Sequence, residues 1–452
     1  MTAHGKILIV TYPGQGHIIP SYRFAKRILK MGVHVTYSTS LSIVRRMEKE
    51  TIPHGLTFAP FSDGHDDGQQ PHTTMQQFLT DFSTNGASAV AEIISSAIAA
   101  SKPFDHLVYT TVLPWAARVG HAYGIKSTVL WCQSATTMDI YYYYFNGYQS
   151  LISSDNSDPT SLVNLPGLPP LTIVDLPSFL LPSCPKEHNF ARAILKDHVE
   201  VLKLSPKILV NSFNELEFES MRAIEKLEFL PIGPLVPLEF LDRKDSIDNS
   251  SGEDFIGKAK DGYMEWLNTK PKSSVVYVSF GTLATLSMDQ MEEIAIGLLD
   301  SRRPFLWIIR DIGIAEGLSK KEELKKQGRI VDWCNQVEVL CHKAIGCFLT
   351  HGGWNSTMEA LAGGVRMVVF PQWSDQATNG KMIEDVWRTG VKVRRREEDG
   401  MVEGKEIERC VEMVMGDDEM KKNAEKWKDL AREAVNNGGS STINLQAFLD
   451  DI

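Results

Sequence analysis

"FLTHGGWNSTMEALAGG", Phe348–Gly364, changes character within a few residues. The overlapping "IGCFLT" predicts a buried strand, and "STMEALAGG" has the apolar spacing of a helix followed by a glycine stop. His351, two glycines, Trp354 and Asn355 therefore stand where a strand ends and a helix begins. A helix N-terminus carries unpaired N–H groups and partial positive charge, so this turn is a candidate phosphate site.

Ser356 and Glu359 allow a simpler interpretation of the same stretch. The spacing Ser-x-x-Glu is that of a capping box, which stabilises a helix start and needs no ligand. Spacing alone leaves both interpretations open. A dinucleotide fingerprint is not a third one, because no Gly-x-Gly-x-x-Gly occurs here.

Short apolar runs alternate with helical patterns on both sides of this stretch, which predicts α/β units with parallel sheets. The predicted strands form two series: "KILIVTYP", "VHVTYST", "HLVYTT", "KSTVLW" and "PKILVNS", then "SSVVYVSFGT", "FLWIIR", "GCFLTHGG" and "RMVVFPQ". A polar, charged segment with the composition of a linker separates them. We predict an N-terminal domain (1–237), a linker (238–260), a C-terminal domain (261–435) and a C-terminal helix (436–452) packing back on the N-terminal domain. Two such domains facing each other across a cleft commonly bind a nucleotide and a second substrate.

Composition narrows the class of protein. The 452 residues are 43% hydrophobic and 23% charged, with a net charge of -10, which argues against a nucleic-acid partner. Six cysteines without a CxxC pair predict neither a disulfide framework nor a zinc site. No signal peptide and no membrane span are expected, since no apolar stretch approaches the ~20 residues that a span needs. We expect a cytoplasmic protein.

The aromatic block "YYYYFNGY", Tyr141–Tyr148, precedes a proline-rich segment, Leu165–Pro185, that should be irregular. The aromatic side chains either pack in the core or line a pocket for a flat or elongated apolar acceptor. The residues alone leave both possibilities open.

The block from Trp333 to Gln376 resembles the signature of plant UDP-sugar-dependent glycosyltransferases of family 1, in length and at both ends. It begins with Trp, ends with Asp-Gln, and contains His-x-Gly-Trp-Asn-Ser and Glu. The resemblance spans the chain, through the early "GQGH", the "IGPL" before the linker, "SVVYVSFGT" and the closing "GGSS". It implies the GT-B fold, with two Rossmann-like domains facing across a cleft. The implied activity is inverting transfer of glucose from UDP-glucose to a carboxyl or hydroxyl group of a small apolar plant metabolite, without cofactor or metal. The sequence does not give the oligomeric state, although a monomer would suit the cleft.

The resemblance also implies a role for each donor-site residue. Grouped by the part of UDP-glucose contacted, these are Trp333 and Cys334 for uracil, Gln336 and Glu359 for ribose, Thr282, His351, Asn355 and Ser356 for the diphosphate, and Trp354, Asp375 and Gln376 for the sugar. A terminal glutamine in this block goes with glucose as the donor sugar.

His17 in "YPGQGHIIP" follows the first predicted strand and precedes the next predicted helix. A lone histidine is more often structural than catalytic, but the resemblance implies that His17 is the general base. A nearby helix N-terminus should keep its imidazole neutral, as a base requires. The predicted acceptor pocket contains Gly16, Thr110, Cys132, Tyr143 and Trp373.

Thr110 in "LVYTTVLPW" stands where most members of the family carry the aspartate that pairs with the base. A threonine cannot stabilise an imidazolium as a carboxylate does. Either Asp63 or Asp139 substitutes, or the acceptor is a carboxylic acid that is already ionised and needs no strong base. The second option favours sugar esters, and this region resembles a subfamily of anthocyanin 5-O-glucosyltransferases and enzymes that form crocetin or hormone glucose esters.

Two further departures lie in the signature block. Gly352 replaces the usual cysteine and should be tolerated in a tight turn, whereas Arg366 replaces a proline and has no explanation in the sequence.

Two other functions compete with the glucosyltransferase. An NAD-dependent oxidoreductase would need a third glycine where Ile19 stands. A nucleotide-sugar-binding protein without catalysis is favoured by Thr110 but opposed by intact His17, Asp375 and Gln376.

Overall fold

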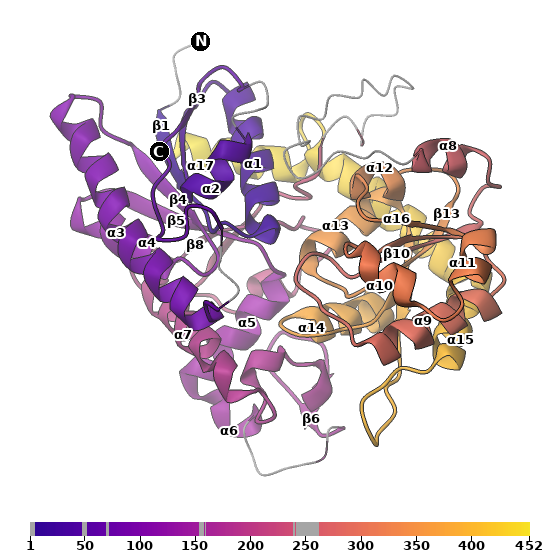
Figure 1. The fold of residues 1–452 in the computed structure, drawn as a ribbon. Helices are drawn as coiled ribbons and strands as arrows, with labels where there is room; N and C mark the ends of the chain where they lie inside the picture. The colour runs from indigo at the N-terminus through magenta and orange to yellow at the C-terminus, as the bar shows by residue number, and fades with distance from the viewer. Residues whose placement is uncertain are drawn as a thin grey trace.

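Two parallel β-sheets, one from each half of the chain, form the two halves of the molecule (Figure 1). This computed structural model describes residues 5–47, 52–68, 72–152, 158, 160–237, 240 and 262–452. Apart from Phe240, the predicted linker 238–260 lies outside the described residues.

The N-terminal sheet has seven strands in the order β3-β2-β1-β4-β5-β8-β9, all parallel. Its strands are β1 (Lys6–Val10), β2 (His34–Ser38), β3 (Leu56–Phe58), β4 (His106–Thr110), β5 (Lys126–Trp131), β8 (Lys207–Val210) and β9 (Glu228–Pro231). The α-helices of this half are α1 (Gln15–Lys30), α2 (Leu41–Met47), α3 (Met75–Ala99), α4 (Pro114–Ala122), α5 (Ala135–Tyr143), α6 (Gln149–Ile152) and α7 (Asn189–Val201). The proline-rich segment is mostly irregular, with a short hairpin of β6 (Leu162–Val163) and β7 (Leu171–Thr172).

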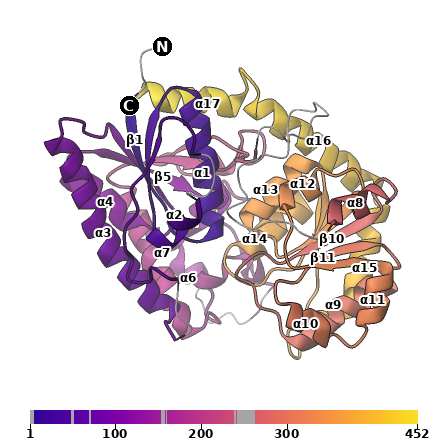
Figure 2. The same ribbon diagram turned by 45° about the horizontal axis from the view of Figure 1, so that its top comes forward.

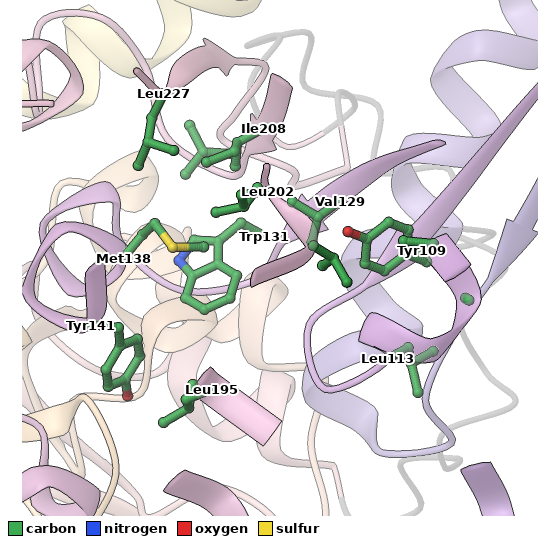
Figure 3. Packing of buried hydrophobic residues seen from close by; sticks show 14 of the residues in the cluster. Tyr109, Leu113, Val129, Trp131, Met138, Tyr141, Leu195, Leu202, Ile208 and Leu227 are labelled. Carbon is green, nitrogen blue, oxygen red and sulfur yellow. The ribbon is translucent and has the colours of Figure 1, made fainter. Parts of the chain in front are cut away.

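Side chains of the N-terminal sheet alternate between two apolar clusters, one on each face. Leu8 and Val10 pack on one face with α3, α4, α5 and α7, whereas Ile7 and Ile9 pack on the other with α1. Trp131 lies in the middle of the first cluster, with Met138 and Tyr141 of α5 beside it (Figure 3). Burial on both faces explains why these strands are continuous apolar runs.

The C-terminal sheet has six parallel strands in the order β12-β11-β10-β13-β14-β15. They are β10 (Val275–Ser279), β11 (Phe305–Ile308), β12 (Arg329–Val331), β13 (Ile345–Thr350), β14 (Arg366–Val369) and β15 (Gly390–Lys392). Its helices are α8 (Tyr263–Asn268), α9 (Met288–Asp300), α10 (Ile312–Gly317), α11 (Lys321–Gln327), α12 (Gln336–Leu340), α13 (Trp354–Gly363), α14 (Gln376–Lys381), α15 (Gly404–Gly416) and α16 (Asp418–Val435). The prediction of two Rossmann-like parallel sheets is confirmed.

Within the two parallel sheets, the strands that the sequence did not reveal are β3, β9, β12 and β15, which form the edges. Each has only three or four residues, and all four contain half-buried or exposed positions. An edge strand has one neighbour instead of two, so it needs less apolar surface and leaves a weaker pattern in the sequence.

Two helices at the end of the chain connect the halves, as Figure 2 shows in yellow. Helix α16 packs against α13, and α17 (Ser440–Asp450) packs against β9. Leu445, Phe448 and Leu449 of α17 are buried in the N-terminal cluster that also holds α1. The end of the chain therefore fastens the C-terminal half to the N-terminal half.

Candidate functional site

The order of strands reverses direction once in each sheet, between β1 and β4 and between β10 and β13. The loops that follow the carboxyl ends of strands diverge at such a reversal, and ligands of open α/β sheets bind there. His17 follows β1 and Thr110 ends β4, while Thr282 follows β10 and His351 follows β13. These four predicted site residues thus lie at the two reversals.

Helix α13 begins at Trp354 with Gly353 as its N-cap, and no side chain caps it. The capping-box interpretation of Ser356 and Glu359 is therefore wrong, because both residues lie inside the helix and bond elsewhere. Gly352 has φ +79, and a Cβ there would lie 2.5 Å from a methyl group of Val369. Close packing thus demands glycine at this turn, and no side chain among the described residues accepts from the first N–H groups of α13.

Gln336, Ser356 and Glu359 form one hydrogen-bonded network. The Gln336 Nε2 donates to Ser356 Oγ (2.9 Å) and to Glu359 Oε2 (2.8 Å). Tyr277 Oη donates to Gln336 Oε1 at 3.2 Å. The other Glu359 oxygen accepts from Arg23 Nη1 of α1 at 2.8 Å, and both charged side chains are buried. The carboxylate predicted for ribose is therefore already oriented by the protein.

His351 lies against the loop that follows β10. Gly281 has φ +74, and a Cβ there would meet the His351 ring at 2.9 Å, so the glycine lets the "SFGT" loop approach the imidazole. Thr282 next to it is exposed. Burial lowers the pKa of His351 to about 4, so its imidazole is neutral at pH 7 and donates from one nitrogen only.

Trp333 and Cys334 precede α12 beside this network. The Trp333 side chain is half-buried, while Cys334 is buried with its Sγ 3.3 Å from Tyr277 Oη. A partly accessible indole can stack on a flat base.

Asp375 ends the loop between β14 and α14, Gln376 is the first residue of α14, and both are buried. Asp375 Oδ1 accepts from Gln133 Nε2 of the N-terminal half (3.0 Å), and its Oδ2 accepts from Asn379 Nδ2 (2.7 Å). Burial raises the pKa of Asp375. The Gln376 side-chain oxygen accepts from the backbone N–H groups of Gln372 and Trp373, which fixes the orientation of its amide.

The proline-rich segment holds this loop from the N-terminal half. Ser178 and Ser374 exchange two hydrogen bonds, at 2.7 and 2.9 Å. The buried Asp175 pairs with Lys392 (2.5 Å) and lies 3.7 Å from Lys381. Burial alone would raise the pKa of Asp175, but the Lys392 ammonium and its hydrogen bonds hold it below its ordinary value.

Trp354 is the first residue of α13, and its predicted contact with the sugar stays a prediction. Its side chain is buried against Trp387, and its single N–H donates to the carbonyl of Asn211 at 2.8 Å. The indole thus belongs to the junction of the two halves.

His17 lies in the first turn of α1, which begins at Gln15, and not ahead of the helix as the sequence predicted. Its ring contacts Tyr12 edge-on at a centroid distance of 5.1 Å. Burial lowers the pKa of His17 to about 4. The imidazole is therefore neutral at pH 7, as predicted, but desolvation is the cause rather than the charge of the helix end.

Thr110 is fully buried, and its hydroxyl accepts from the backbone N–H of Tyr12 at 3.1 Å. Nδ1 of His17 is buried and has no hydrogen-bond partner in the part of the chain that the structure describes. Asp63 instead accepts from the His65 backbone, and neither oxygen of Asp139 has a partner among the described residues. Neither carboxylate replaces the expected partner of His17.

The predicted acceptor residues fall into two groups. Gly16 accepts a hydrogen bond from Asn355 Nδ2 at 2.9 Å, and Trp373 is half-buried against Phe179 and His188 of the proline-rich region. Cys132 and Tyr143 are buried in apolar clusters, and the Tyr143 hydroxyl donates to the carbonyls of Pro166 and Ala223. Core packing accounts for the position of the Tyr143 side chain, and its assignment to the pocket stays a prediction.

Several residues that hold the site were not found from the sequence: Arg23, Gln133, Asp175 and Asn211. Gln133 follows the carboxyl end of β5, which was an available signal. Asn211 follows the carboxyl end of β8 and carried the same signal, whereas Arg23 and Asp175 carried none. Arg366 now has an explanation, because its Nη1 donates to three carbonyls at the C-terminus of α15, those of Val414, Met415 and Asp417.

Within the described residues, no group of three or more His, Cys, Asp or Glu could hold a metal ion. None of the described helices is long and apolar enough to cross a membrane.

Comparison with known proteins gives concordant results. Residues 258–434 match the family model described as "UDP-glucoronosyl and UDP-glucosyl transferase". The chain is 50% identical to UDP-glycosyltransferase 75C1 of Solanum lycopersicum, over 98% of this chain and 97% of the relative. It is 48% identical to the chloroplastic crocetin glucosyltransferase of Gardenia jasminoides, over 100% of this chain and 98% of the relative. The structure of Os79 from O. sativa in complex with UDP superposes with a TM-score of 0.86 at 31% identity, covering 98% of this chain and 99% of that one.

Proposed function

The chain belongs to the UDP-glucoronosyl and UDP-glucosyl transferase family, and we propose that it moves glucose from UDP-glucose to a carboxyl or hydroxyl group of a small apolar plant metabolite. One observation carries the proposal. The 2.9 Å hydrogen bond from Asn355 Nδ2 to the Gly16 carbonyl joins the N-terminus of α13 to the N-terminus of α1, one residue before His17. The start of the donor-binding helix therefore adjoins the candidate base.

The α13 N-terminus, with His351 and Thr282, would hold the diphosphate, and the oriented Glu359 would accept from the ribose hydroxyls. Asp375 and Gln376 would fix the sugar. The acceptor oxygen then attacks the anomeric carbon as the bond from that carbon to the UDP oxygen breaks, and UDP leaves with the electron pair. Backbone N–H groups and dipoles directed at the diphosphate favour this departure.

For a hydroxyl acceptor, neutral His17 takes the proton as the new bond forms. Attack from the face opposite UDP inverts the configuration. Because Nδ1 of His17 has no carboxylate partner in the described structure, nothing there stabilises the imidazolium that results. A carboxylate acceptor avoids this difficulty, since it brings no proton to remove. We therefore propose that carboxylic acids belong to the acceptor range.

The test is a mass-spectrometric assay with UDP-glucose and a panel of flavonoids, anthocyanidins and carboxylic acids. Crocetin heads the panel, because one relative is named for glucosylating it. Products are then treated with mild alkali, with heat-denatured protein as the control. We expect at least one alkali-labile glucose ester. Alkali-stable phenolic glucosides alone would contradict the acid preference, and UDP binding without any transfer would favour a binding protein.

The proposal also covers the metal requirement, the oligomeric state and the cellular compartment. Transfer should need no metal, so EDTA should leave the rate unchanged. A monomer is expected in light scattering after size exclusion. We place the protein in the cytosol, although one relative is named chloroplastic, and a fluorescent fusion in leaf cells distinguishes the two compartments.

A further inference from the structure

Two hydrogen bonds between described residues join helices α1 and α13. Gly16 and Arg23 lie about two turns apart on α1, and Asn355 and Glu359 lie one turn apart on α13, so each pair shares one face of its helix. Asn355 bonds to Gly16 at 2.9 Å, and Glu359 bonds to Arg23 at 2.8 Å. Figure 2 shows the two helices adjacent to each other between the sheets. The base-bearing helix is thus fixed to the donor-binding helix.

The second contact is a buried ion pair. Arg23 is only 6% exposed and the Glu359 side chain 7%, and Arg23 Nη1 also donates to the Leu235 carbonyl at 3.0 Å. Because Arg23 Nη1 donates to both a carbonyl and a carboxylate, the planar guanidinium is held in one orientation. A buried carboxylate without a cation would be costly, so Arg23 sets both the charge balance and the position of Glu359.

Both Glu359 oxygens have a protein donor, Arg23 on one and Gln336 on the other. A carboxylate has about four acceptor positions, so ribose hydroxyls can still be accommodated. On the basis of the proposed function, we propose that Arg23 is a positioning residue that holds Glu359 for the ribose hydroxyls and sets the helix of His17 relative to the donor. Arg23 contacts Glu359 and thus acts through it.

Ribose discrimination tests this role, because a general loss of structure would not affect it selectively. UDP and 2′-deoxy-UDP binding are compared by calorimetry on the full chain. In the wild type, we expect UDP to bind about tenfold more tightly, as one hydrogen bond to a charged group predicts. In Arg23→Gln, we expect UDP binding to weaken until the ratio is about one to two. A ratio that stays at the wild-type value, or equal weakening of both ligands, would overturn the proposal.

Arg27 offers a matched control one turn further along α1. Its guanidinium donates to the carbonyls of Ile232 and Pro234, within the N-terminal half. Arg27→Gln should keep the tenfold ratio, and loss of the ratio in this variant would contradict a specific role for Arg23. If Arg23→Gln does not fold, Arg23→Lys decides, because a point charge restores the pair without the planar fork. In Arg23→Lys, an affinity ratio of UDP to 2′-deoxy-UDP between those of the wild type and of no discrimination supports the proposal. A ratio equal to that of the wild type overturns it.

Turnover provides the second measurement. With saturating UDP-glucose and a phenolic acceptor, kcat of Arg23→Gln should fall about tenfold, since the helix carrying His17 loses its ion pair with α13. Unchanged kcat would contradict the proposal that Arg23 sets the position of the helix carrying His17 relative to the donor. Failure of the wild type to bind UDP or to transfer glucose would contradict the proposed function instead, so the two failures are distinguishable.

Discussion

The donor side and the acceptor side of the site differ in how their polar groups are held. On the donor side, Gln336, Ser356 and Glu359 bond to one another, and Asp375 bonds through both oxygens. On the acceptor side, Nδ1 of His17 has no hydrogen-bond partner among the described residues, and packing against Tyr12 orients the ring. A binding site for a polar, constant ligand can be fully organised by hydrogen bonds, whereas an apolar acceptor offers few groups that could organise its side.

The largest effect is expected from removing the base. His17→Ala should lower kcat for a phenolic acceptor by about 10²–10⁴-fold, the usual contribution of a general base. UDP affinity should stay unchanged, because the donor side does not depend on the imidazole. Steady-state kinetics and calorimetry measure the two quantities. A carboxylic acid acceptor should lose much less, and equal losses for both acceptor types would contradict the proposed role of ionised acceptors.

Removing the Glu359 carboxylate, which is predicted to bind ribose, tests the donor side, where hydrogen bonds hold the polar groups. Glu359→Ala leaves Arg23 buried without its carboxylate, which should lower the free energy of unfolding by about 3–5 kcal/mol. Denaturant unfolding of this variant is compared with Glu338→Ala, which removes a half-buried glutamate of α12. A loss below about 1 kcal/mol would show that the ion pair is exposed to solvent in solution.

An intermediate effect is expected from weakening the contact between the proline-rich segment and the loop that leads from β14 to Asp375 and Gln376. Asp175→Asn removes the carboxylate charge that faces Lys392 and Lys381. We expect KM for UDP-glucose to rise about tenfold while UDP affinity is kept, since only the loop with Asp375 and Gln376 is released. Asp385→Asn, at the exposed partner of Lys381, is the control and should change neither value. If UDP affinity fell by the same factor as KM for UDP-glucose rises, the effect would not be confined to the loop with Asp375.

The smallest expected effect is on the pH dependence of kcat/KM. Because burial lowers the pKa of His17 to about 4, the imidazole is a competent base above that pH, and kcat/KM should be lost as the pH falls through about 4. Thr110→Asp introduces a carboxylate that favours the imidazolium, so the acid limb should move up by about one pH unit and kcat for phenols should rise a few-fold. An unchanged profile would show that the new carboxylate does not reach His17.

The central strands, the turn at His351 and the glycine-terminated α13 were predictable because each follows from a local pattern. Gly364 ends that helix with φ +72, as a glycine stop requires. The predictions failed where the outcome depended on distant partners. Ser356 and Glu359 have capping-box spacing, but their side chains bond to Gln336 and Arg23 instead.

The sequence by itself determined the α/β architecture, because periodicity and glycine positions are properties of neighbouring residues. The donor-site roles and His17 as the base are what the resemblance to the family implies, and they stay predictions. The tertiary structure alone decided which polar groups pair. Arg23 and Glu359 are 336 positions apart, and they meet only because the two sheets dock with their strand reversals facing each other. A side chain's partner across such an interface depends on the docking of whole domains, which no local pattern records.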